Sequence, residues 1–112
     1  MSNEIPILLS RDVAEEAANE PGRLSALMLR HGSMEVRWYA PKETDPQSPH
    51  DQDELYVVVV GRGWFVRGEE RVPFRAGDVL FVPAHQPHKF DNFTPDLAVW
   101  LILYGAKGGE TA

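Results

Sequence analysis

The feature that most constrains the fold is a series of short apolar or alternating segments, which begins at Arg23 and is interrupted by Gly, Pro and Asp. This pattern is typical of an all-β sandwich or barrel, because each segment has the length of one strand and each interruption favours a turn. The predicted strands are residues 24–30, 34–40, 54–60, 64–67, 71–74, 79–82, 88–93 and 97–104. We therefore predict an antiparallel β-barrel made of two facing sheets.

Alternation along these strands indicates which side chains fill the barrel. Successive side chains of a strand point to opposite faces, so residues of equal parity share a face. The predicted core side chains include Val58, Val60, Val66, Leu80 and Val82.

The connections between the predicted strands carry their own signals. Gly68-Glu69-Glu70 is expected to turn a hairpin. Residues 41–49 contain three prolines and no apolar side chain, which predicts a loop that leads to His50. Gly61-Arg62-Gly63 joins two predicted strands and does not open a helix, so it does not predict a phosphate-binding loop.

The length of 112 residues leaves room for a single domain, residues 1–112, with one modest core. We expect the barrel over about residues 23–104, an N-terminal arm over residues 1–22, and a frayed tail over residues 105–112.

The N-terminal arm has two distinct parts. Residues 5–9 are apolar but contain Pro6, which predicts an edge strand or an extended arm. Asp12 and Glu15 have the spacing of a capping box, and residues 13–19 are rich in Ala and Glu, which predicts one or two helical turns.

Composition excludes several classes of function. The 43% of hydrophobic residues predicts a globular protein. The formal net charge is −6 and the Lys and Arg residues are scattered, so we expect no nucleic-acid partner. The chain has no leader-like segment and no apolar run near the roughly 20 residues that span a bilayer, so we expect a cytoplasmic protein with no membrane partner. Because the chain has no cysteine, any metal must be bound through nitrogen and oxygen.

Two segments place metal-binding residue types at the ends of predicted strands. His50 precedes and Glu54 begins a β-branched run, and parity puts both on the face of Tyr56 if the intervening residues stay extended. In the second segment His88 and Phe90 share a face. If the two strands face each other, two imidazoles and one carboxylate come together.

These two segments resemble the motifs of the cupin family. The family's first motif is G-x5-H-x-H-x3,4-E-x6-G, and His50-x3-Glu54-x6-Gly61 matches its second half. The second motif is G-x5-P-x-G-x2-H-x3-N, and Gly77-x5-Pro83-x-His85-x2-His88-x3-Asn92 matches it at all but one position. The resemblance covers about residues 30–104 and implies a jelly-roll barrel, which is an antiparallel double-stranded β-helix.

Three positions depart from the family's pattern. Ser48 stands where the first histidine of the motif is expected, Lys42 stands at the first glycine, and His85 stands at the glycine of the second motif. One of the family's four metal ligands is therefore missing.

The resemblance implies that three metal ligands remain: His50, Glu54 and His88. Two imidazoles and a carboxylate with open positions suit a divalent transition metal, namely Fe, Mn, Ni or Zn. Gln52 or a water is a candidate for the coordination position that the missing histidine would fill. The residues that would extend the pocket around the metal are Gln52, His85, Tyr56 and Phe90.

Each of these residues also has a purely structural interpretation. His88 fits the cap of a strand, and Glu54 fits an ordinary carboxylate at the start of one. His50 fits a solvated loop, and His85 and His31 both fit surface turns.

The resemblance leaves two classes of function open. One is a metalloenzyme that acts on a small oxygen-rich organic molecule by dioxygenase-, isomerase- or cyclase-type chemistry, in which Glu54 shuttles a proton if it is not firmly ligated. The other is a non-catalytic module that binds a small molecule with a degenerate or metal-free site, and the loss of the first histidine favours it. No Gly-x-Ser-x-Gly elbow supports a hydrolytic triad.

We also expect a second partner besides the small molecule. The edge-like N-terminal segment and the apolar runs at residues 24–29 and 97–104 predict a homodimer that buries open sheet edges.

Overall fold

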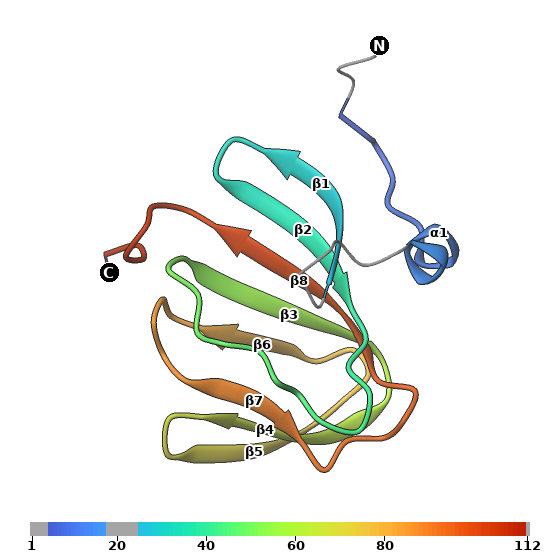
Figure 1. The fold of residues 1–112 in the computed structure, drawn as a ribbon, viewed down its shortest axis with the longest axis vertical. Helices are drawn as coiled ribbons and strands as arrows, with labels where there is room; N and C mark the ends of the chain where they lie inside the picture. The colour runs from blue at the N-terminus through green and yellow to red at the C-terminus, as the bar shows by residue number, and fades with distance from the viewer. Residues whose placement is uncertain (1–4, 18–24, 112) are drawn as a thin grey trace.

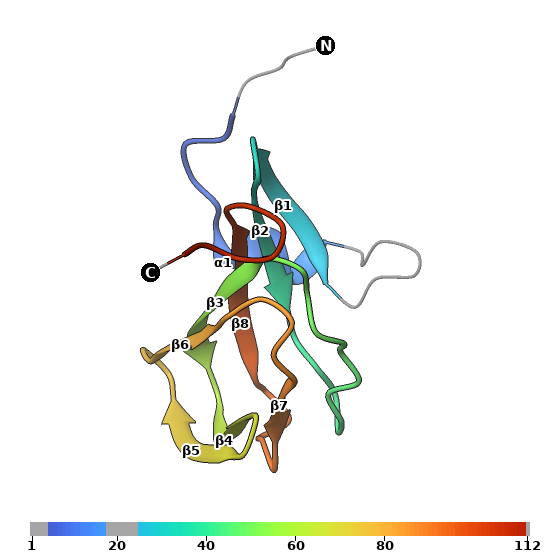
Figure 2. The same cartoon turned by 90° about the vertical axis from the view of Figure 1, so that its left-hand side faces the viewer.

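The fold consists of two antiparallel sheets that face each other (Figures 1 and 2). The computed structural model describes residues 5–17 and 25–111. The strands are β1 (Ala26–His31), β2 (Met34–Tyr39), β3 (Asp53–Val60), β4 (Arg62–Arg67), β5 (Glu70–Arg75), β6 (Val79–Val82), β7 (His88–Asp91) and β8 (Ala98–Tyr104). Every predicted strand is present, and its ends lie within two residues of the prediction. The all-β, jelly-roll prediction is confirmed.

The order of the strands brings distant parts of the chain together. The larger sheet has the order β1-β2-β8-β3-β6, and the smaller has the order β5-β4-β7. The hairpin between β4 and β5 turns at Gly68 and Glu69, as the sequence predicts. By contrast, β8 pairs with both β2 and β3, and β7 pairs with β4, so the two motif segments lie in different sheets.

The register of the larger sheet arranges its inner face in rows. In one row Glu54 pairs with Leu103 of β8 on one side and with Val82 of β6 on the other. In the next row Tyr56 pairs with Leu101. Because directly paired residues share a face, Glu54 points into the barrel from a surface that is otherwise apolar and aromatic.

The barrel core is rich in aromatic and branched side chains. The fully packed members are Tyr39, Tyr56, Val58, Phe65, Phe74, Val82, Phe90, Leu97, Val99, Leu101 and Leu103. Val58 and Val82 are thus buried in the core as predicted, and Leu80 packs against it while partly buried.

Two core predictions are wrong, each for a reason of register. The pairing of β3 with β8 shifts between Val58 and Val60, so Val60 leaves the barrel core and packs in a second cluster with Trp38 and Ala98. On β4 it is Phe65 that is buried in the core, so the adjacent Val66 points to the opposite face.

The single helix among the described residues, α1 (Arg11–Glu16), covers the outer face of the larger sheet (Figure 1). Its Ala14 is buried against Trp38 and Ala98. The predicted capping box is wrong: Ser10 is the N-cap, and its Oγ accepts a 3.2 Å hydrogen bond from the amide of Val13. Residues 18 and 19 of the predicted helix lie outside the described residues. No helix within 5–17 or 25–111 is long and apolar enough to cross a membrane.

The segment before the helix is an extended arm rather than an edge strand. Residues 5–9 form no strand, and Ile7 and Leu8 are exposed. Figure 2 shows this arm leading away from the sheets.

Residues 108–110 of the predicted frayed tail are bonded to the barrel, contrary to the prediction, and residue 112 lies outside the described residues. The amide of Gly108 donates to the carbonyl of Asp51, and the amide of Glu110 donates to Oδ2 of Asp53 at 2.9 Å. The other oxygen of Asp53 accepts a 3.0 Å hydrogen bond from the amide of Ala84. Gly109 has φ of +91°, and a Cβ there would lie 2.8 Å from Asp53 Oδ1, so only glycine fits this approach.

Asp53→Ala should therefore lower the free energy of unfolding of the metal-free protein by about 2–4 kcal/mol, because two hydrogen bonds to a charged acceptor are lost. Chemical denaturation measures the change. Asp51→Ala is the matched control: the substitution removes the same charge, and the Asp51 side chain is exposed. Equal stability of the two variants would contradict this role of Asp53.

Candidate metal centre

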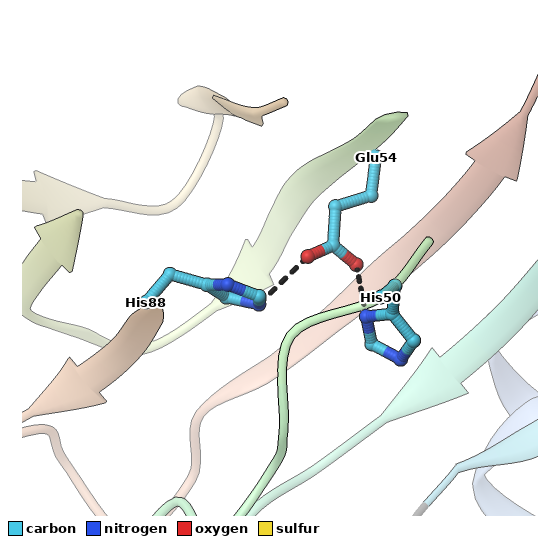
Figure 3. A group of neighbouring side chains, drawn as sticks. All are labelled: His50, Glu54 and His88. Carbon is cyan, nitrogen blue, oxygen red and sulfur yellow. Dashed lines mark ion pairs between the residues drawn. The ribbon is translucent and has the colours of Figure 1, made fainter. Parts of the chain in front are cut away.

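The candidate centre is built around the carboxylate of Glu54, which lies between two imidazoles (Figure 3). Its Oε2 is 2.9 Å from Nδ1 of His50, and its Oε1 is 2.7 Å from Nε2 of His88. Only 1% of the Glu54 side chain is exposed. The three residues predicted from the sequence therefore meet, and each offers a ligand atom within 4.8 Å of the others.

The bonding of these atoms fits a cation. Both oxygens of Glu54 and Nδ1 of His50 are buried, yet none of them has a hydrogen-bond partner among the described residues. They approach the neighbouring groups at ion-pair distance without the direction of a hydrogen bond. Buried polar atoms are normally satisfied, so this group of convergent atoms is able to take up a cation. The donor set, nitrogen and oxygen without sulfur, suits a divalent transition metal.

His88 is oriented by its own strand end. It is the first residue of β7, and its Nδ1 lies 2.8 Å from the carbonyl oxygen of Gln86. A carbonyl oxygen can only accept a hydrogen bond, so Nδ1 carries a proton. The other ring nitrogen, Nε2, faces Glu54. Histidine ligands of metals are commonly oriented by such a hydrogen bond from the other ring nitrogen.

His50 is positioned by a turn from the other motif. The carbonyl of His50 accepts a 2.7 Å hydrogen bond from the amide of His85. His85 has φ of +68°, a left-handed conformation that usually calls for glycine or asparagine. The cupin motif has glycine at this position, and the left-handed backbone conformation explains why. In this chain the His85 backbone adopts that conformation. The His85 residue itself is exposed.

A polar network that the sequence did not reveal borders the centre. The hydroxyl of Tyr56 lies 3.0 Å from Nε2 of His88 and donates to Oε1 of Gln47 at 2.8 Å. Gln47 in turn donates to Asp45 at 2.7 Å, and Asp45 accepts from the amide of Phe90 at 2.8 Å. Asp45 and Gln47 belong to the proline-rich loop, and nothing in their local sequence links them to residues 40 positions away.

Burial and ion pairing act in opposite directions on the two charged groups. Burial raises the pKa of Glu54, but its contacts with His50 and His88 outweigh this effect and lower the pKa overall. Burial lowers the pKa of His88, but its contact with Glu54 outweighs burial and raises the pKa above 6.5. Burial also raises the pKa of Tyr56 well above 10.0, so its hydroxyl stays protonated. The metal-free centre thus favours a carboxylate beside an imidazolium.

The other predicted pocket residues have different surroundings. Gln52 donates to the carbonyls of Ser33 and Gly105, at 2.8 and 2.9 Å, and so ties the β1–β2 turn to the C-terminal segment. Phe90 is buried in the core, where its ring lies 5.0 Å from that of Tyr56. Ser48 is exposed in its loop, and the exposed His31 ends β1, in agreement with its interpretation as a turn residue.

Two cavities show where a small molecule has room. One, of about 480 Å³, lies on the outer sheet face beneath α1 and is lined by Arg11, Trp38 and Lys42 among others, away from the metal ligands. Another, of about 190 Å³, lies between β4, β5 and β6 and includes Phe65, whose ring is 6.2 Å from that of His88. Phe65 thus brings this smaller cavity next to the His88 ring of the candidate centre.

Comparison with known proteins agrees with this geometry. A family profile described as the Cupin domain matches residues 35–104. An uncharacterized protein of Streptomyces coelicolor is 42% identical over 92 residues, which cover 80% of this chain and 86% of that protein.

Two solved structures share the fold. The plu4264 protein of Photorhabdus luminescens has a TM-score of 0.68 and 18% identity, with 90% of this chain and 89% of that one covered. A Cupin 2 conserved barrel domain protein of Salinispora arenicola has a TM-score of 0.66 and 21% identity, with coverage of 93% and 92%. At these identities the likeness concerns the fold alone.

The pairing of Glu54 with His88 predicts a measurable titration. In the metal-free protein, Glu54→Gln should lower the pKa of His88 from its wild-type value, because the ion pair is removed while the burial that disfavours the imidazolium remains. NMR titration of the His88 ring protons measures it. Asp51→Asn, an exposed neighbour, is the control. An unchanged His88 pKa in Glu54→Gln would contradict the pairing.

Proposed function

The chain belongs to the cupin family, and from this premise we propose that it binds one divalent transition metal through His50, Glu54 and His88 and acts with it on a small oxygen-rich organic molecule. The observation that carries the proposal is that His50, Glu54 and His88 each bring a ligand atom within 4.8 Å of the others, with both Glu54 oxygens and Nδ1 of His50 buried and without hydrogen-bond partners among the described residues. A neutral structural triad would instead satisfy these atoms by hydrogen bonds.

Each residue has a definable role. Glu54 supplies the negative charge that a buried cation requires, and the two imidazoles supply neutral nitrogen ligands. A bound divalent ion would supply a Lewis acid that polarises a substrate carbonyl or enol. With three protein ligands, coordination positions remain for water or substrate, since Ser48 offers only an exposed neutral hydroxyl.

Tyr56 positions the centre from the inside of the barrel. Its single proton is directed to Gln47, so a lone pair of its oxygen is directed toward His88. The hydroxyl therefore accepts from Nε2 of the protonated His88 ring and releases it when Nε2 turns to a cation, and the fully buried Tyr56 leaves the interior side of the centre filled by protein. Substrate must then approach from another side.

The alternative function is a non-catalytic module that binds a small molecule. The observation in its favour is the same loss of the fourth ligand, because a site with three ligands holds its metal less firmly. The two functions differ in turnover: a metal-loaded enzyme converts a substrate, whereas a binding module returns it unchanged.

His88→Ala should weaken binding of Zn(II) or Mn(II) on the order of a hundredfold, because one of three ligands is lost. Metal content after purification without chelator, and calorimetric titration of the metal-free protein, measure the effect. His31→Ala should bind as the wild type does, since His31 is exposed at the end of β1. Equal metal content in the wild type and His88→Ala would show that the site is misassigned.

Ser48→His should tighten metal binding, because it restores the fourth imidazole of the family's pattern at the motif position that Ser48 occupies. The same titration compares its Kd with that of the wild type. Ser48→Ala is the control and should leave the Kd within about twofold, since the hydroxyl is a weak neutral ligand. Weaker binding in Ser48→His would show that the loop does not direct this position toward Glu54.

A further inference from the structure

Arg67 lies on β4 directly beside the candidate metal ligand His88, and its side chain is partly exposed. The two residues are directly paired between β4 and β7, so their side chains share the inner face of the smaller sheet. On the other side Arg67 pairs with Glu70 of β5. A row of His88, Arg67 and Glu70 thus runs from the metal centre to the edge of the smaller sheet.

This row borders the cavity of about 190 Å³ between β4, β5 and β6. The cavity is lined by Phe65, Arg67, Glu70, Val72, Val79, Leu80 and Phe81. Its inner end includes Phe65, whose ring also contacts that of His88. Its rim includes Val72, Val79 and Phe81, which are 43%, 60% and 42% exposed and are unusually large apolar groups to leave in water. The cavity therefore runs from an apolar rim toward the metal ligands.

The guanidinium of Arg67 makes two exposed hydrogen bonds. Nη1 donates to the carbonyl of Phe81 at 3.0 Å, and Nη2 lies 3.2 Å from Oε1 of Glu70. The Glu70 side chain is 71% exposed, and an ion pair with so exposed a partner contributes little. An arginine has five donors in a fork that matches a carboxylate, so Arg67 can exchange Glu70 for an anionic ligand.

We propose that this cavity binds a small organic carboxylate with a short apolar chain, with the carboxylate on Arg67 and the chain against Phe65 and Leu80. This inference goes beyond the proposed function, because it names an anion site next to the three metal ligands and does not require a metal to be bound. The volume is below the roughly 300–1,000 Å³ of pockets for drug-sized ligands, so the ligand is small. The apolar walls favour a hydrocarbon body over a sugar or a phosphate.

The charges of the site point the same way. Glu70 already places one carboxylate on Arg67, and a ligand carboxylate replaces it with the same charge and geometry. A phosphate would bring about two negative charges beside Glu70 and Glu54, in a chain of net charge −6, against one arginine. A monocarboxylate is therefore the better match.

The test uses butyrate as the probe and the full-length chain, with and without Zn(II). Calorimetry should show that Arg67→Gln weakens butyrate binding about ten- to a hundredfold, as expected for the loss of a charge-assisted, bidentate contact. Butyramide, which is neutral, should bind the wild type no better than it binds Arg67→Gln. Amide NMR shifts induced by butyrate should fall on Phe65, Arg67 and Phe81.

Two further variants separate binding from structure. Arg71→Gln is the matched control, because Arg71 lies on the neighbouring strand, carries the same charge and stacks on Trp64 outside the barrel; it should bind butyrate within twofold of the wild type. Glu70→Gln should bind butyrate a few-fold more tightly, since it removes the competitor for Arg67. An Arg67 that only braces the strands would give no such tightening.

The outcomes distinguish this inference from the metal site. Arg67→Gln should keep the Zn(II) content of the wild type, whereas His88→Ala loses it. If His88→Ala keeps its Zn(II), the proposed function fails whatever butyrate does. If butyrate binds Arg67→Gln as it binds the wild type, or shifts only amides remote from Phe65 and Phe81, the carboxylate site is wrong while the metal site stands.

Discussion

The buried carboxylate of Glu54 is the constraint around which the rest of the site is arranged. A carboxylate inside an apolar barrel is costly unless an opposite charge compensates it. The rows around Glu54 are filled by Leu103, Val82 and Tyr56, none of which carries a positive charge. Compensation comes from His50 and His88, which reach Glu54 from a loop and from the opposite sheet. The centre therefore exists only when the two sheets are closed.

The loop of residues 41–49 closes the barrel through Asp45. This carboxylate accepts from the amide of Phe90 in β7 and from the hydroxyl of Tyr39 in β2, which belong to different sheets. Gln47 extends the contact to Tyr56 and so to His88. The same loop carries Ser48 and ends at His50. Its fold thus determines how closely one ligand approaches the other two, which links the rigidity of the loop to the quality of the centre.

Much of the architecture follows from local patterns in the sequence. Short apolar or alternating segments between Gly, Pro and Asp located every strand, and period-two alternation placed Glu54, Tyr56 and Val58 on one face, because strand geometry depends on neighbouring residues. The errors fall where geometry is not local. The bulge after Val58 moves Val60 out of the core. The hydrogen bond from the Glu110 amide to Asp53 orders a polar, glycine-rich tail whose sequence predicts a frayed end.

The site divides in the same way. The sequence by itself determined the strand pattern and the three ligand types, since the spacing of His50, Glu54 and His88 with Gly61 and Pro83 is a local pattern of cupin motifs. Only the tertiary structure decided that these ligands meet around a buried Glu54 carboxylate, that Asp45 fastens the loop across both sheets, and that Arg67 lies beside His88. The physical reason is that the contacts of Glu54 with His88, Asp45 with Phe90 and Arg67 with His88 join distant segments of different strands and loops, and their distances depend on strand register and sheet closure, which no single segment encodes.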